Sequence, residues 1–157
     1  MTIGTELVTL MNETLEAELA LGPEREEVVR LAEYTRDVQL STLKARDRGE
    51  LVEGCDPRSR DELLAETRVR PWPELERDAR AVVASLSERI ATVTDDELVA
   101  EDPWSEIGEP PLWRQLFCSG VLYSVTLRSE LLRDGGDVDE AIRLNERLRD
   151  RVSATSL

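Results

Sequence analysis

Apolar residues recur at intervals of three and four along nearly the whole chain, and runs that alternate apolar with polar residues are absent. This spacing places side chains on one face of an α-helix, whereas a half-buried strand requires alternation. The pattern therefore predicts an all-α fold. With 157 residues, the chain is long enough to enclose a hydrophobic core in a single domain, residues 1–157.

Glycine, proline and capping residues divide this pattern into separate helices. Four long helices are expected, over residues 5–21, 23–48, 73–93 and 111–134. Ser59 with Glu62, and Thr94 with Glu97, have the spacing of capping boxes that begin two short helices. The long crossover at 49–72 and a last helix at 137–152 predict a four-helix bundle with an extra C-terminal helix.

The apolar stripes indicate which helix faces are buried. The first and third long helices each carry one continuous stripe: Leu7, Leu10, Met11, Leu15 and Leu19, then Leu75, Ala79, Val82, Val83, Leu86 and Ile90. In the second long helix, the predicted stripe is Val28, Leu31, Thr35 and Val38, widened by Val29, Leu40 and Leu43. These faces are expected to form the core.

The charge of the chain argues against two classes of partner. It has 34 acidic and 20 basic residues, and its formal net charge is −14. Such a surface repels the phosphates of nucleic acids and of anionic membranes, so neither is an expected partner. The chain shows neither a signal-peptide pattern nor an apolar run of the roughly 20 residues that span a bilayer. A cytoplasmic location is therefore expected.

The chain contains no histidine and only two cysteines, Cys55 and Cys118. Histidine is the commonest transition-metal ligand and the usual acid–base group near neutral pH, so zinc hydrolysis and histidine-dependent nucleophilic catalysis are excluded. No nucleotide-binding glycine motif is present either, and neither a metal nor a cofactor is expected. Cys118 is interpreted as buried and unreactive.

Several local patterns follow one another in a characteristic order. They are Trp72 with Leu75 and Asp78, the run 85–90, the run 93–98, Leu112-Trp113, the helix 119–131, and Asp134-Gly135-Gly136-Asp137. Together they resemble the DinB-like superfamily of bacterial four-helix bundles, including its DfsB/ClbS-like branch. The resemblance extends from about Val28 to Ala141.

The resemblance implies a metal site that this chain lacks. Members typically hold a divalent metal with three histidines, one from the second helix and two, four residues apart, from the fourth. The matching positions here are Leu31, Tyr123 and Leu127. None of these side chains can replace histidine, so the resemblance implies a metal-free relative without the metal-dependent thiol-transferase activity of some members.

Tyr123 is the most notable polar residue of the fourth long helix, on a stripe with Gly120 and Glu130. Gly120 is expected to permit a close helix–helix contact or, alternatively, to form the floor of a pocket. Tyr123 is expected to be a core aromatic residue or a hydrogen-bond donor in that pocket. Glu33 and Asp37 are expected to be solvated or paired with arginine. The ligand-pocket candidates are Tyr34, Asp37, Ser119, Tyr123 and Glu130.

Two classes of function remain open at this stage. In the first, the chain binds or modifies a small molecule without a metal, as some members of the DfsB/ClbS-like branch do with reactive natural products. In the second, it is a non-catalytic structural or interaction homodimer. Apolar residues outside the main stripes would then form a twofold interface; they are Val29, Leu40, Val121 and Val125.

Overall fold

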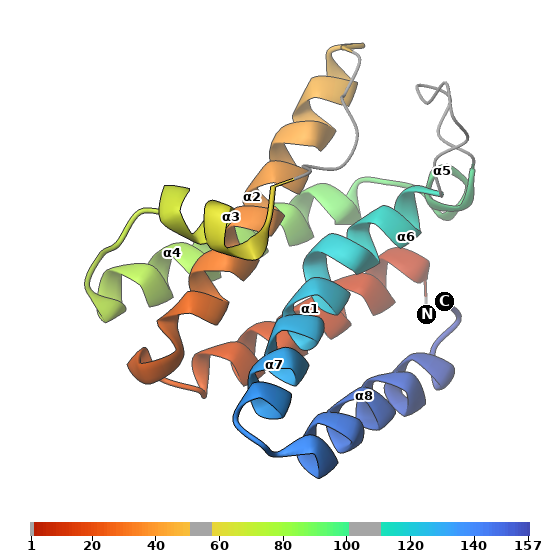
Figure 1. Ribbon diagram of the computed structural model, residues 1–157. Coiled ribbons are helices and arrows are strands. Elements are labelled where there is room, and N and C mark those ends of the chain that lie inside the picture. Colours follow the sequence, from red (N-terminus) through yellow and green to blue (C-terminus); the bar gives the residue numbers. More distant parts are fainter. Residues whose placement is uncertain (1, 51–57, 101–110) are drawn as a thin grey trace.

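The computed structural model describes residues 2–50, 58–100 and 111–157 (Figure 1). All regular elements in these ranges are helices, in agreement with the all-α prediction. In chain order they are α1 (Ile3–Leu19), η1 (Pro23–Arg25), α2 (Glu26–Asp47), α3 (Arg60–Glu66), α4 (Trp72–Ala91), α5 (Asp95–Val99), α6 (Leu112–Phe117), η2 (Cys118–Leu122), α7 (Tyr123–Asp134) and α8 (Val138–Ser153).

The predicted helix starts have the expected caps. At α3, the Ser59 hydroxyl accepts from the Glu62 N–H and the Glu62 carboxylate accepts from the Ser59 N–H. Thr94 and Glu97 form the same reciprocal pair at α5. The Asp137 carboxylate caps α8 by accepting from the Glu140 N–H at 3.2 Å. Each cap satisfies backbone donors that the first helical turn leaves without partners.

The main hydrophobic core is enclosed by α1, α2, α4 and the continuous segment α6–η2, with α5 at one end. Both stripes predicted for α1 and α4 are buried in full. The prediction for α2 was partly wrong, because Val38 is 43% exposed. Val28 and Leu31 are buried as predicted, and so are Val29, Leu40 and Leu43. The buried residues of α2 also include Ala32, Arg36 and Gln39, which the prediction left out.

The segment predicted as one helix over 111–134 contains a wider π-helical turn, η2, between α6 and α7. Here the Tyr123 N–H donates to the Cys118 carbonyl, five residues earlier. Gly120 lies in this turn, and a Cβ atom added there would be 3.1 Å from the Met11 sulfur of α1. The expected close helix–helix contact at Gly120 is therefore confirmed, because any larger side chain would require the Met11 side chain of α1 to shift.

Helices α7 and α8 form a hairpin whose turn contains Gly135-Gly136, as the sequence predicts (Figure 1). Gly136 has a φ of 87°, a conformation that side chains with a Cβ atom rarely adopt. Helix α8 then runs back along α7, which brings the two chain ends close together (Figure 1). The Ser156 N–H donates to the Glu6 carboxylate at 2.8 Å, and Arg151 forms an ion pair with Glu13 at 2.9 Å.

Candidate functional site

Two of the three positions that the resemblance assigns to metal ligands lie in a small leucine cluster. Leu31 of α2, Leu63 of α3 and Leu127 of α7 are in contact and buried. Tyr123, the third position, packs against this cluster together with Tyr34. The fold thus brings the three positions together and fills the space between them with aliphatic side chains.

Tyr34 lies at the edge of the leucine cluster, beneath an arginine. Arg58 Nη2 donates to the Tyr34 hydroxyl at 2.6 Å, and its guanidinium carbon lies 5.9 Å from the centre of the ring. The arrangement combines a charge-assisted hydrogen bond with a cation–π contact. Tyr34 therefore helps to hold the start of α3 against α2.

Tyr123 and Glu130 lie on the same face of α7, two turns apart, near Arg60. Arg60 forms an ion pair with Glu130 at 3.1 Å. Burial raises the pKa of Tyr123 above its ordinary value, and the Glu130 carboxylate raises it further, while Arg60 acts in the opposite direction. The Tyr123 hydroxyl is thus protonated at neutral pH and can donate a hydrogen bond but cannot act as a phenolate base.

This pKa shift predicts a measurable effect at alkaline pH. The raised folded-state value means that the unfolded chain releases the Tyr123 proton first, at about its ordinary pKa of 10.0. The resulting stability is present below that pH and is lost as the pH rises through the folded-state pKa. Because the chain has two tyrosines, Tyr34→Phe leaves Tyr123 as the sole tyrosine chromophore. Its ultraviolet titration should have a higher midpoint in the folded variant than in urea, and equal midpoints would refute the assignment.

The remaining pocket candidates lie apart from the leucine cluster. Ser119 donates to the amide oxygen of Gln39 at 3.2 Å, and Asp37 is exposed on the outer face of α2. Glu33 forms an ion pair with Arg70, one of the two situations expected for it. Burial nevertheless raises the pKa of Glu33, because the loss of hydration outweighs the attraction to Arg70.

The most deeply buried charges form a bridge between α1, α2 and η2. Arg36 donates two hydrogen bonds to the Glu18 carboxylate, at 2.6 and 2.8 Å, and two to the Gly120 carbonyl, at 2.7 and 3.2 Å. The Arg36 and Glu18 side chains are 1% and 0% exposed. This paired arrangement satisfies a carbonyl oxygen of the π-helical turn and fixes how the three elements meet.

Sequence reasoning missed this pair, although a signal was present. Arg36 is four residues after Ala32 and four before Leu40, which is the spacing of one helix face. Glu18 follows Leu15 by three residues and so continues an apolar stripe. One acidic and one basic residue at core positions of two helices indicate a buried ion pair, because an isolated charge there would be too costly.

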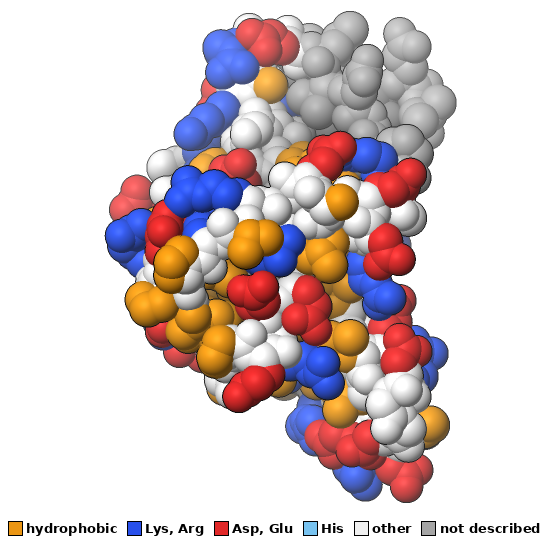
Figure 2. Space-filling view, turned by 60° about the vertical axis from the view of Figure 1, so that its left-hand side comes forward, with side chains coloured by type: hydrophobic (Ala, Val, Ile, Leu, Met, Phe, Trp, Pro, Cys, Tyr) orange, Lys and Arg blue, Asp and Glu red, His pale blue; other side chains and the backbone are white. Residues whose placement is uncertain are grey.

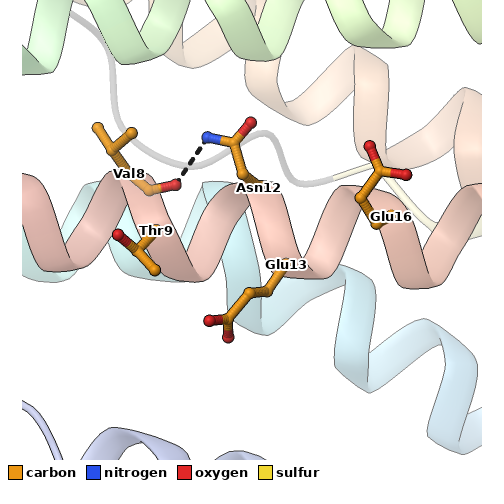
Figure 3. A pocket seen from close by; sticks show the side chains of 5 residues that line it. All are labelled: Val8, Thr9, Asn12, Glu13 and Glu16. Carbon is orange, nitrogen blue, oxygen red and sulfur yellow. Dashed lines mark hydrogen bonds between the residues drawn. The ribbon is translucent and has the colours of Figure 1, made fainter.

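One surface hollow is an open groove along α1 (Figure 3). All five residues that line it belong to this helix: Val8, Thr9, Asn12, Glu13 and Glu16. Asn12 donates to the Val8 carbonyl at 2.8 Å. Glu13 is paired with Arg151, and Glu16 with Arg80. The groove has few groups left to recognise a ligand.

A second pocket, of about 220 Å³, lies at the other end of α1, between α7 and α8. Helix α7 contributes Arg128, Leu131 and Leu132, whose spacing places them on one face. Helix α8 contributes Glu140, Leu144 and Arg147, which likewise share a face. Leu21, two residues after α1, and Arg25 of η1 complete the lining. Gly22, with a φ of 77°, makes the turn that leads to η1.

The charges of this pocket are paired except for one. Arg147 binds Glu140 at 2.7 Å, and Arg25 lies 3.7 Å from Glu27. Arg128 is half-buried, and its guanidinium has no hydrogen bond or ion pair with any residue that the structure describes. Burial lowers the pKa of Arg128, the Glu18 carboxylate acts in the opposite direction, and the neighbouring positive charge of Arg147 lowers the pKa further. The pocket thus contains a partly desolvated cation among leucines.

Arginine and acidic side chains are interspersed on the face of the molecule in Figure 2, with small apolar areas between them. The four residues expected to form a dimer interface are not among the exposed ones: Val29, Leu40, Val121 and Val125 are all at most 8% exposed. That assignment was wrong, because these side chains pack inside a single chain.

Cys118 is exposed, so its interpretation as a buried residue was also wrong. Cys55 lies outside the described residues.

Comparisons with family models, with curated proteins and with solved structures find no match to this chain. Within the described ranges, no three cysteine, aspartate or glutamate side chains are grouped closely enough to hold a metal ion. No helix in the described part of the chain is both long and apolar enough to cross a membrane.

Proposed function

We propose that this chain binds a small molecule, without a metal, in the pocket between α7 and α8. We also propose that its long helices form a four-helix bundle of the DinB-like type, with a crossover after α2 and α8 as the extra helix. The order of the helices and the sequence patterns from Trp72 to Asp137 support this second part. The absence of histidine from the sequence supports metal independence.

The main support for the proposal is that the half-buried Arg128 has no hydrogen-bonding or ion-pair partner among the described residues. Burying part of a guanidinium costs hydration, and proteins normally compensate that loss with a carboxylate or a carbonyl oxygen. No described residue supplies such a partner to Arg128. An apolar pocket with one available cation is the arrangement that ligand sites use, where apolar walls give affinity and a few polar groups give orientation.

The leucine cluster beside Tyr123 is a less favoured location for small-molecule binding. Leu31, Leu63 and Leu127 fill the space beside Tyr123, and Ser119 and Asp37 lie elsewhere. The homodimer alternative has lost its main support, because the apolar residues proposed for its interface are buried within one chain.

A thermal-shift screen of small molecules tests the proposal. A ligand present at 100 times its Kd should stabilise the protein by about 2.7 kcal/mol. For a protein of this size, each kcal/mol corresponds to about 2–4 °C in Tm. Leu132→Trp should abolish the shift, because the larger side chain fills the pocket.

The matched control is Leu122→Trp, which adds the same side chain at a residue that is 37% exposed and does not line the pocket. This variant should retain the ligand-induced shift. The proposed function fails if no compound stabilises the wild-type protein, or if every stabilising compound acts equally on Leu132→Trp.

A further inference from the structure

The ligand that fits this pocket can be described more closely from its charges, its walls and its volume. This inference rests on the proposed function, since it names the class of molecule that the same pocket takes. Arg128 contributes the one cation that no carboxylate nearby neutralises, because Arg147 and Arg25 have Glu140 and Glu27 as partners. Glu18, the more distant acid that influences Arg128, already receives two hydrogen bonds from Arg36. Among the described residues, the positive charge of Arg128 is therefore available to a ligand.

The available charge selects a monoanion. A ligand with one negative charge would neutralise Arg128, the arginine of the lining that binds no described carboxylate. A dianion would place its second charge near Glu140, an acid whose pKa is held low by hydrogen bonds from Arg147 and Arg143. The planar guanidinium donates two parallel hydrogen bonds most favourably to the two oxygens of a carboxylate.

The walls and the volume define the rest of the molecule. Leu21, Leu131, Leu132 and Leu144 provide an aliphatic lining around the guanidinium. About 220 Å³ is less than the roughly 300–1,000 Å³ of pockets that hold drug-sized ligands. A short aliphatic chain matches this space.

We propose that the pocket between α7 and α8 binds a short-chain aliphatic monocarboxylate, with the carboxylate on Arg128 and the alkyl chain against the leucines. The recognition has two separable parts. The leucines bind any alkyl chain of suitable length, and Arg128 distinguishes an anionic end from a neutral one. Removing the negative charge from the ligand should therefore weaken binding by the same factor as removing the positive charge of Arg128 from the protein.

The experiment compares hexanoate with hexanamide, its neutral counterpart of nearly equal size, by ligand-observed NMR titration of the untagged full-length chain. Hexanoate should bind at least about tenfold more tightly, the factor that corresponds to one charge-assisted hydrogen-bonding contact. Arg128→Gln should weaken hexanoate about tenfold and leave hexanamide unchanged. Arg128→Lys, which keeps the charge but lacks the two-pronged geometry, should give an intermediate affinity.

Arg149→Gln is the matched control, because it removes the same charge from an exposed arginine of α8 that does not line the pocket. It should bind hexanoate as the wild type does. Equal binding of hexanoate and hexanamide, or equal loss in both arginine-to-glutamine variants, would overturn the monocarboxylate inference and leave the proposed function standing. If hexanoate does not bind, but a compound from the screen does and Leu132→Trp abolishes its binding, only the monocarboxylate inference fails. If no compound binds at all, both fail.

Discussion

Replacing Arg36 with methionine is expected to lower the free energy of unfolding by about 3–5 kcal/mol, the usual cost of removing one partner from a buried ion pair. Glu18 is fully buried, and its carboxylate would lose the two hydrogen bonds that Arg36 donates. The Gly120 carbonyl would lose its hydrogen bonds from Arg36 as well. Urea unfolding followed by circular dichroism measures the loss as a lower midpoint at an unchanged slope.

The double variant Glu18→Leu with Arg36→Met separates the cost of an unpaired charge from the value of the pair. Apolar residues of similar volume often replace a buried ion pair without loss, so the double variant should recover most of the stability. Arg149→Met, at an exposed ion pair, is the control and should unfold close to the wild type. Equal midpoints for Arg36→Met and Arg149→Met would contradict the role assigned to the bridge.

Introducing histidine at positions 31, 123 and 127 is expected to create a zinc site at the leucine cluster. The substitutions are Leu31→His, Tyr123→His and Leu127→His. Leu31 and Leu127 are in contact, and Tyr123 packs on the same cluster. Residues 123 and 127 share a face of α7, so three imidazoles could converge on one ion with Zn–N distances of about 2.0–2.1 Å.

The metal-free triple variant should be less stable than the wild type, because two buried leucines are replaced by polar groups. Zinc at 100 times its Kd should restore about 2.7 kcal/mol. Calorimetric titration of the protein refolded with and without zinc measures the stoichiometry, which should be one.

The matched control moves one histidine out of the buried cluster by using Thr126→His in place of Leu127→His. Thr126 is exposed, whereas Leu127 is buried in contact with Leu31. The control variant should bind zinc weakly or not at all. Equal zinc binding by the two triple variants would contradict the positional match to the DinB-like pattern.

The sequence was sufficient to predict the helices and most of their buried faces, because both depend on local spacing. The α4 stripe and the caps at Ser59 and Thr94 need only residues within the same helix or turn. The π-helical turn was not predicted, because a hydrogen bond between residues five positions apart does not require particular residue types. The residues of Cys118–Leu122 therefore show no distinct sequence pattern. This turn changes the helical phase, which explains why Gly120 contacts α1 while Tyr123 packs beside α3.

The candidate site was harder to predict because its members come from separate helices. Arg128 resembles any surface arginine in the sequence, and nothing local indicates that it has no partner. Its situation depends on the α7–α8 hairpin, on the end of α1 and on how neighbouring charges pair. The predicted residues on α2 and α7 were chosen from single-helix faces, so they could not identify a pocket formed between α7 and α8.

The attachment of α8 has a consequence for the order in which the fold assembles and opens. Only Ala141 and Leu144 of this helix are buried. The C-terminal end of the chain is held to α1 by two long-range contacts: Arg151 binds Glu13, which lies 138 positions earlier in the sequence, and Ser156 binds Glu6, which lies 150 positions earlier. Contacts that close such long loops form late, and regions with little buried apolar surface open before the rest. We therefore expect the contacts that tie the tail of α8 to α1 to form late and to open early, and a ligand that touches both α7 and α8 would hold α8 in place.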